Sequence, residues 1–375
     1  MDRRDFIRLS GGGLLFGVLP GCAAQPDPRA AWSHPGAGET DPRKRALSWA
    51  ILAPNPHNMQ PWLADLSEPD VITLYVDRSR LLPVTDPFNR QITVGCGAFL
   101  ELLRMAAARD KLTAVIQPFP QGEGHPLLDE RPVARIMFRD GAAPDPLFAY
   151  APARRTNRSP YDERAVSPAA AQVIVSAASV PMVSADATIE PARVTRFSTL
   201  AFQGSYVEAH TPPAHRESVA RTFIGAKDIA VHRYGISVDG PAIEAAHAVG
   251  LLTQDRMATP GTFAYDQALA FLKKAADTAR GWIWIMTPGD SRAEELAAGA
   301  AYLRANLAAT GLGISMHPFS QVLQEYETMN ALRAGIHREL APSGGRVQMF
   351  ARIGYAKSVP PAPRRGLDQN LLVRA

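Results

Sequence analysis

Four segments of the chain have apolar residues at helical spacing, and two of them begin with a start signal. Asp41-Pro42 and Ser167-Pro168 each place a capping side chain before a proline, which is typical of the first turn of a helix. Residues 92–109 carry Leu, Met, Phe and Ala on most faces, so we expect a buried helix there. The predicted helices cover residues 42–52, 92–109, 168–178 and 293–310.

Shorter runs of β-branched, aromatic and other apolar residues predict strands. Residues 71–76 alternate in polarity as a half-buried strand does. The other predicted strands cover 135–138, 192–197, 282–287 and 347–355. Between 202 and 264 the pattern is irregular and holds only short helical pieces, so we expect an insertion that covers a ligand as a lid.

The order of these elements repeats along the chain. Gly97 opens a helical segment that leads to Pro118-Phe119, and Gly299 opens one that leads to Pro318-Phe319. A predicted strand precedes each helix and another ends each half, which indicates a duplicated α+β unit. The expected units are a first half over 42–150 and a second half over 151–375, which contains the insertion 202–264.

The first 22 residues read as an export signal and not as part of the fold. Arg3-Arg4 is followed by Phe6, as in a twin-arginine motif that the export machinery of that pathway recognises. The apolar, glycine-rich stretch 9–19 is too short to remain in a bilayer as a spanning helix. The alternative is an unstructured N-terminus that happens to hold two arginines.

Residues 19–22 resemble a lipobox that ends in Cys22. An acylated Cys22 would anchor the protein to a membrane, whereas cleavage after Ala23-Ala24 would release a free periplasmic protein. Residues 23–41 have no periodic pattern and are rich in Pro, Gly, Ala and Asp, so we expect a flexible tether.

Composition narrows the function classes. The chain is 46% hydrophobic and 20% charged, an ordinary globular balance, and its net charge of +4 is too weak and dispersed to indicate nucleic-acid binding. His210 and His215 have no metal-ligand context, so we expect no metal site. Cys96 lies between two glycines in an apolar segment and is expected to be a packing residue with no intrachain disulfide partner.

Two short segments carry candidate chemistry. Residues 53–62 place two prolines and two asparagines directly after a predicted helix, a turn that can present rigid backbone and amide groups to a planar ligand. Residues 154–161 hold three arginines and a threonine, which suit a phosphate group. The alternatives are a plain connection with a buried Trp62 and a solvated basic linker.

Together these segments resemble motifs of the nitroreductase family of flavoproteins. Residues 58–62 resemble its Asn-x-Gln-Pro-Trp motif, and residues 154–158 resemble its Arg-Arg-Ser-x-Arg motif with Thr156 in place of Ser. Gly311 to Ser320 is similar to the segment beside the flavin ring, and residues 82–87 match the Acg-like branch. The resemblance extends over about residues 42–372.

This resemblance implies a nitroreductase fold that binds FMN where two units meet. The family is usually a homodimer, but here the Gln-Pro-Trp turn occurs only in the first half and the Arg-Arg-Thr segment only in the second. The chain therefore resembles a dimer fused into one monomeric polypeptide with one FMN site.

The resemblance also assigns roles at the cofactor. The residues expected to face the ribityl phosphate are Arg154, Arg155, Arg364 and Arg365. Thr156 and Arg158 are expected to face the phosphate or the pyrimidine edge of the ring. The first half would contribute ring contacts from Pro54, Asn55 and Asn58, and backbone N–H groups near Phe319 and Ser320 would approach flavin N5.

Two functions follow from the resemblance. The first is an oxidoreductase that reduces nitroaromatic or quinone-like acceptors through the flavin, and the second is a non-catalytic protein that binds or sequesters the flavin beneath a lid. A cofactor-free scaffold is a third class. No catalytic residue is assigned, although His57 borders the expected ring site and is either a proton donor or a local hydrogen-bonding residue.

Overall fold

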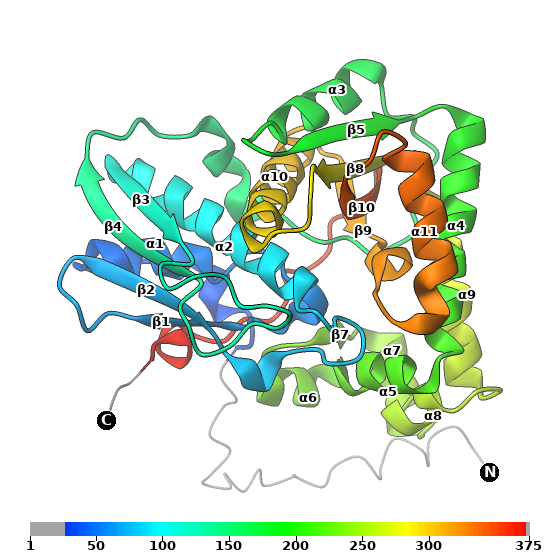
Figure 1. Ribbon diagram of the computed structural model, residues 1–375. Helices are drawn as coiled ribbons and strands as arrows, with labels where there is room; N and C mark the ends of the chain where they lie inside the picture. Colours follow the sequence, from blue (N-terminus) through cyan, green and yellow to red (C-terminus); the bar gives the residue numbers. More distant parts are fainter. Residues whose placement is uncertain (1–26, 373–375) are drawn as a thin grey trace, which may run out of the picture.

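The structure is a computed structural model that describes residues 27–372 (Figure 1). The predicted export signal and Cys22 lie outside the described residues. Within 27–372, no helix combines the length and the apolar character needed to cross a membrane.

Two four-stranded antiparallel sheets have the same strand order. The first runs β1-β2-β4-β3 and the second β5-β8-β10-β9. The strands of the first sheet are β1 (Trp62–Asp65), β2 (Val71–Val76), β3 (Leu112–Pro118) and β4 (Ala134–Asp140). Those of the second are β5 (Ser184–Thr188), β8 (Gly281–Thr287), β9 (Ser315–Pro318) and β10 (Arg346–Gly354). This shared order is consistent with the duplicated unit that the sequence indicates.

Two long helices, α2 (Arg90–Arg109) and α10 (Arg292–Gly311), pack between the sheets (Figure 1). Their backbones approach closely at Gly97 and Gly299, the residues that mark the sequence repeat. A Cβ at Gly97 would lie 2.0 Å from the carbonyl oxygen of Leu296, and one at Gly299 would lie 1.9 Å from that of Val94. The glycines therefore set the spacing between the two halves.

The helix starts follow local chemistry. Asp41 accepts a hydrogen bond from the N–H of Arg43 before α1 (Pro42–Ala50), and Ser167 accepts one from Ala170 before α3 (Pro168–Ala177). Ser291 forms a capping box before α10. The predicted helices at 42–52, 92–109, 168–178 and 293–310 are confirmed with small shifts at their ends.

One predicted strand is wrong. Residues 192–197 lie in α4 (Pro191–Ala209), because Glu190 caps this helix and Pro191 occupies its first turn. Phe197 and Ala201 then share a buried face, which is a helical spacing. The strand of this region is the preceding β5, which the sequence pattern did not reveal.

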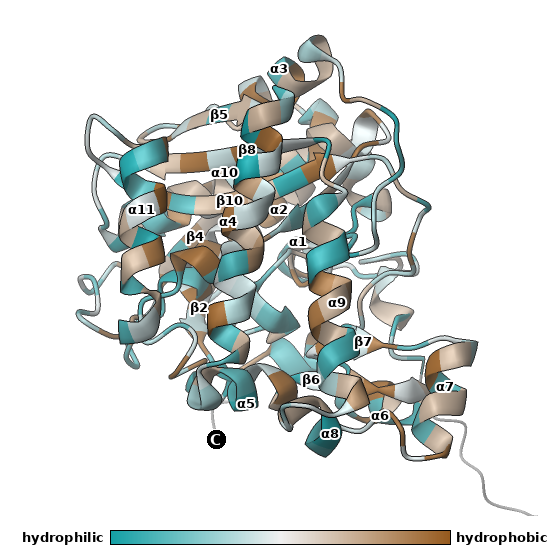
Figure 2. Cartoon of the chain, turned by 90° about the vertical axis from the view of Figure 1, so that its right-hand side faces the viewer, coloured by the Kyte–Doolittle hydropathy of each residue, from teal (hydrophilic) through white to brown (hydrophobic). Residues whose placement is uncertain are grey.

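The second half contains a long insertion between β5 and β8. Position 202 falls inside α4, so the irregular segment starts later than its predicted boundary. The insertion continues through α5 (Pro212–Ala220), β6 (Thr222–Ile224), α6 (Gly225–His232), β7 (Ile236–Val238), α7 (Pro241–Ala248), α8 (Gln254–Ala258) and α9 (Phe263–Asp277). Figure 2 shows α5 to α8 gathered at one end of the molecule, below α9. The last helix, α11 (Asn330–Leu340), follows the insertion and precedes β10.

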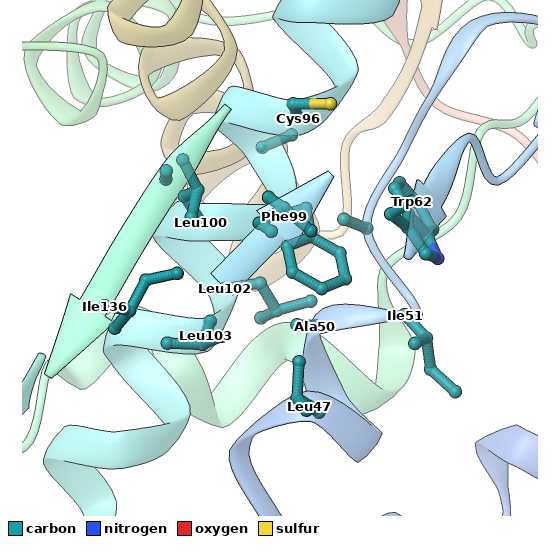
Figure 3. Packing of buried hydrophobic residues seen from close by; sticks show 14 of the residues in the cluster. Leu47, Ala50, Ile51, Trp62, Cys96, Phe99, Leu100, Leu102, Leu103 and Ile136 are labelled. Carbon is teal, nitrogen blue, oxygen red and sulfur yellow. The ribbon is translucent and has the colours of Figure 1, made fainter. Parts of the chain in front are cut away.

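The first core joins α1, α2 and the first sheet. Leu47, Trp62 and Phe99 point into it (Figure 3), and the rings of Trp62 and Phe99 lie 4.9 Å apart. Cys96 is fully buried in the same core, and burial raises the pKa of its thiol to about 12. The expectation that Cys96 is a packing residue is confirmed.

The close helix contact generates a stability prediction. We expect Gly97→Ala to destabilise the fold by about 3 kcal/mol, because the new methyl group would meet backbone atoms that only a shift of a whole helix can move. Urea denaturation of the full chain measures this difference.

Gly335→Ala in α11 is the matched control, since a Cβ at Gly335 has no atom within 4 Å. We expect this variant to be unchanged or to gain up to about 1 kcal/mol from the better helix propensity of alanine. Equal stabilities of the two variants would contradict the proposed role of Gly97.

Candidate functional site

A cavity lies where the two halves and the insertion meet. The first half contributes the turn after α1 and one side of α2, and the second half contributes the segment after Arg155, helix α10 and the residues after β9. The residues that line the cavity are Pro54, Asn55, Pro56, His57, Leu82, Thr85, Asp86, Gln91, Val94, Gly95, Ala98, Thr156, Arg158, Ile236, Tyr302, His317, Pro318, Ser320, Gln321, Gln324 and Met349. Five of the predicted site residues are among them: Pro54, Asn55, Thr156, Arg158 and Ser320.

The turn after α1 has an unusual backbone. His57, Asn58 and Gln60 all have left-handed φ angles, of 46°, 53° and 53°. Such angles cost non-glycine residues about 1 kcal/mol or more each, so the surrounding contacts must hold the turn. One of these contacts lies within it, where the Oδ1 of Asn55 accepts a hydrogen bond of 2.7 Å from the N–H of Gln60.

The insertion also holds this turn. Nδ2 of Asn58 donates to the carbonyl of Gly235 at 3.1 Å, and Nε2 of Gln60 donates to that of Arg233 at 2.9 Å. The same Asn58 amide donates to the carbonyl of Pro363 at 3.0 Å. Asn58 is thus buried, and its amide is held by the insertion and by Pro363, while its ring contact stays a prediction.

The segment that follows Arg155 lies alongside β9. Thr156 forms a parallel bridge with Met316, and the N–H of Asn157 donates to the Met316 carbonyl at 3.3 Å. In extended backbone, residues two apart point to the same side, and Thr156 and Arg158 both line the cavity.

Arg158 is the cation of this cavity. Within residues 27–372, no hydrogen bond or ion pair is formed by its guanidinium group, and burial lowers its pKa. Burial, followed by the charge of Arg158, lowers the pKa of His57 to about 4. The pKa of His317 is lowered well below its ordinary value by burial, then by Arg352 and Arg158. Both imidazoles are therefore neutral near pH 7, and Arg158 is available for an anionic or strongly polar ligand.

Three residues that line the cavity each carry a buried polar atom that has no hydrogen-bond partner among residues 27–372. These atoms are the hydroxyl of Tyr302, the Oγ of Ser320 and the Oε1 of Gln321. Burial raises the pKa of Tyr302 to about 12, so its hydroxyl remains a donor. Leaving buried polar groups unsatisfied costs about 1–3 kcal/mol each, and a ligand with ring nitrogens and carbonyl oxygens would remove this cost.

Arg364 and Arg154 do not line the cavity. Arg364 donates to the carbonyls of Ile51, Leu52 and Ala53 at 2.9, 3.2 and 3.0 Å, and Arg154 donates to Leu52 at 3.0 Å. These carbonyls belong to the residues that directly follow α1, and they have no hydrogen-bond donor within the helix. In this structure the protein itself uses the donors of both arginines, and their phosphate contacts stay predictions.

Arg365 is likewise committed to the protein. Its guanidinium donates to the carbonyl of Gln60 at 2.8 Å and to Oδ1 of Asn370 at 2.7 Å, and its phosphate contact stays a prediction. Arg155 donates to two local carbonyls and keeps a buried Nε without a partner. Its phosphate contact stays a prediction.

Phe319 was expected to present its N–H group to a ring. Instead, that N–H donates to the carbonyl of Phe350 at 2.9 Å, and the side chain packs 5.8 Å from the ring of Trp282 in the core. Phe319 therefore supports the neighbouring Ser320 from behind and does not reach the cavity.

The described part of the predicted tether, 27–41, has defined structure. Trp32 donates to the carbonyl of Ala362 at 2.8 Å, and its ring lies 5.8, 4.8 and 5.5 Å from the guanidinium carbons of Arg154, Arg155 and Arg364. Such cation–π contacts stabilise arginines that have no carboxylate beside them. Pro28, Arg29 and Trp32 all form hydrogen bonds to the C-terminal segment, and the flexible tether stays a prediction.

Several cavity residues had no clear signal in the sequence. Tyr302 lies among alanines in α10, where an aromatic reads as a core residue, and His317 precedes the Pro-Phe pair that was noted only as part of the repeat. Asp86, Gln321 and Gln324 reach the cavity through tertiary packing alone.

Comparisons with known proteins bear on this geometry. A Mycobacterium tuberculosis protein named "Putative NAD(P)H nitroreductase" is 28% identical over 341 residues, which cover 87% of this chain and 90% of that protein. The chain is similar to nitroreductases over most of its length. An uncharacterised protein of the same organism is 27% identical over 341 residues, 88% of this chain and 93% of its own length.

Two further matches are a relative that is similar over a shorter segment and a solved structure. A Mycobacterium tuberculosis protein named "Putative NAD(P)H nitroreductase acg" is 34% identical over 128 residues, which cover 33% of this chain and 37% of that protein. The solved structure of a single-residue mutant of an FMN- and NADPH-dependent nitroreductase from a Sphingopyxis strain has a TM-score of 0.36 at 17% identity, and the match covers 60% of this chain and 96% of that one. No protein-family model matches the chain.

The lowered pKa of His57 generates a prediction about stability and pH. The fold binds neutral His57, so its contribution is complete above about pH 6.5 and is lost as the pH falls toward 4. At pH 4.5 this loss amounts to about 2–3 kcal/mol. We therefore expect His57→Gln to gain stability relative to the unaltered protein as the pH is lowered from 7.5 to 4.5.

Urea unfolding of both proteins at pH 7.5, 5.5 and 4.5 measures this difference. Asp86, whose pKa burial raises to about 6, titrates in the same range with the opposite sign, but it is present in both proteins and cancels in the comparison. A difference in unfolding free energy that does not vary with pH would contradict the buried neutral state of His57.

Proposed function

We propose that this protein is an FMN-dependent oxidoreductase that reduces nitroaromatic or quinone-like acceptors at the cavity between its halves. The observation that carries the proposal is the convergence of Asn55 from the first half with Arg158 and Ser320 from the second around one cavity. These residues come from the three segments whose motifs resemble the nitroreductase family. The similarity to named nitroreductases over 87% of the chain supports the same reading.

The donor set of the cavity suits a flavin ring. Arg158 would hold the electron-rich pyrimidine edge, and the unpartnered Tyr302 and Ser320 hydroxyls would bond ring nitrogens or carbonyls. Pro54 and Asn55, held in the strained turn, would pack against the ring. When bound, FMN supplies the electron transfer, and these residues orient it and exclude water.

We further propose that the chain acts as a fused dimer with one cofactor site. Support comes from the matching strand orders of the two sheets and from the paired glycines between α2 and α10. The turn with Asn55 occurs only in the first half and the Thr156–Arg158 segment only in the second, so one complete cavity results. This proposal implies a monomer.

The cofactor proposal predicts a yellow protein with about one FMN per chain, released on denaturation. We expect Arg158→Ala to lower FMN content at least about tenfold, because it removes the charge that faces the ligand. Absorbance of the purified protein before and after denaturation measures the ratio.

Arg164→Ala is the matched control, since Arg164 lies on the same segment but is exposed and paired with Asp162. Its flavin content should equal that of the unaltered protein. A colourless protein that cannot be reconstituted with FMN would refute the cofactor proposal.

A second candidate function is flavin binding without turnover. The insertion favours it, because Ile236 lines the cavity and the Gly235 carbonyl bonds the turn that carries Asn58. Stopped-flow mixing with NADH, NADPH or a quinol separates the two candidates. Rapid bleaching of the flavin supports the enzyme, and no bleaching by any donor supports storage.

We also propose export by the twin-arginine pathway, followed by residence in the periplasm or at a membrane through acylated Cys22. The support is the sequence of residues 1–22. We expect replacement of both Arg3 and Arg4 by Lys to retain the protein in the cytoplasm, and Cys22→Ser to shift it from the membrane to the soluble periplasmic fraction. Cell fractionation tests both, and an unchanged distribution of the double lysine variant would refute the export route.

A further inference from the structure

A chain of hydrogen bonds leads from the cavity to a buried carboxyl group. Nε2 of His57, which lines the cavity, lies 3.1 Å from Oγ of Ser218. The same Oγ lies 2.7 Å from Oε1 of Glu208, so the Ser218 hydroxyl can pass a proton between the carboxyl group and the imidazole. The other oxygen of Glu208 accepts from Nε2 of Gln324 at 2.7 Å, so the carboxyl group is fixed from two sides.

Several charged and polar side chains surround these three hydrogen-bonded residues. Arg158 and Arg221 face His57, and Glu217 faces Glu208. The hydroxyl of Tyr326 donates to Oε1 of Gln324 at 2.8 Å. Glu208 is buried, and the described residues place no Lys or Arg in an ion pair with it, so desolvation raises its pKa. Burial therefore favours the protonated form of Glu208 at one end of these hydrogen bonds and the neutral imidazole of His57 at the other.

The carboxylate of Asp86, which lines the cavity, is already engaged in hydrogen bonds. Its two oxygens accept hydrogen bonds of 3.0 and 2.9 Å from the N–H groups of Gln91 and Ile92 at the start of α2. Loss of these bonds would expose the helix start. Glu217 also approaches the cavity, because one of its oxygens accepts a hydrogen bond of 2.7 Å from the hydroxyl of Thr85. Glu208 differs in that an imidazole as well as a hydroxyl links it to the cavity.

We propose that Glu208, Ser218 and His57 form a proton relay that delivers a proton to the acceptor in the cavity. This inference rests on the proposed function and gives the insertion a second role. Glu208 lies at the end of α4 and Ser218 in α5, so the insertion supplies the acid while the strained turn supplies the imidazole that presents it.

The proton count balances. Reduction of a quinone to a hydroquinone takes two electrons and two protons. A hydride equivalent from a reductant such as NADH, passed on through the cofactor, brings both electrons and one proton. For the other proton, Glu208 gives its Oε1 proton to Ser218, Ser218 gives its own to Nε2 of His57, and His57 gives the Nδ1 proton to the acceptor oxygen. Return of the proton from Nε2 to the carboxylate, with uptake of a proton from water at Nδ1, restores the starting state.

The left-handed backbone of His57 is part of this arrangement. His57 has a φ angle of 46°, lines the cavity and contacts Ser218, and the hydrogen bonds of the neighbouring Asn58 and Gln60 hold this backbone. Strain of this kind persists where the surrounding structure fixes a side chain for a task.

Two variants test the relay in the flavin-loaded protein. Glu208→Gln keeps the acceptor for Ser218 but removes the acid, and Ser218→Ala interrupts the chain. After reduction, each is mixed either with a benzoquinone, which takes up protons, or with ferricyanide, which takes electrons alone. We expect both variants to be slowed at least about tenfold with the quinone, as for loss of an acid catalyst, and to stay within about twofold with ferricyanide.

Ser205→Ala is the matched control. Ser205 is a buried serine of α4 whose hydroxyl donates only to the carbonyl of Ala201, at 3.3 Å, so both rates should be unchanged. Equal slowing of both oxidants by Glu208→Gln would show a structural role and overturn the relay.

A second measurement does not depend on turnover. Infrared difference spectra of the unaltered protein against Glu208→Gln, recorded over a range of pH, should show a neutral carboxylic acid band that persists above the ordinary titration range of glutamate. If the band is missing at every pH, Glu208 is always ionised and cannot donate. A protein that cannot be loaded with FMN overturns the proposed function and this use of the relay, whereas a loaded protein with an unchanged quinone rate overturns the relay alone.

Discussion

The carbonyl groups of Ile51, Leu52 and Ala53 end helix α1 inside the protein, where water cannot hydrate them. Buried carbonyls must find donors, and here the donors are arginines from distant parts of the chain, chiefly Arg364 with help from Arg154. This requirement fixes where the chain leaves α1 and hence where the turn with Asn55 and His57 begins. The cavity, its strained turn and the hydrogen bonds to the insertion all depend on that exit.

The sequence predicted most of the framework, because its signals are local. Capping residues and helical spacing located α1, α2, α3 and α10 without reference to the rest of the chain. The spacing of Gly97 and Gly299 pointed to two similar halves. Residues 192–197 were misread since Val194, Thr195 and Phe197 favour strands by composition, while the deciding feature was the Glu190-Pro191 start just before them.

The hydrogen-bond partners of the predicted site residues could not be read from the sequence, for a physical reason. A run of arginines identifies cations but not their partners, which tertiary packing decides. Arg154 and Arg364 serve the end of α1, Arg365 serves Gln60, and only Arg158 of the predicted arginines reaches the cavity. Tyr302 and His317 went unnoticed because an aromatic or histidine in an apolar segment has the same signature whether it packs or binds.

The attachment of Trp32 has a consequence for the order in which the protein matures. The strap from Pro28 to Trp32 is held by the segment 361–364, and one of these hydrogen bonds joins residues 332 positions apart. During synthesis this strap is made early, whereas segment 361–364 is made late. Until then the carbonyls that follow α1 lack the hydrogen bonds that Arg364 donates. The contacts of Trp32 with Arg154 and Arg364 can therefore form completely only after nearly all of the described chain has been translated. Most of the fold can form before the turn that borders the cavity is fully held in place.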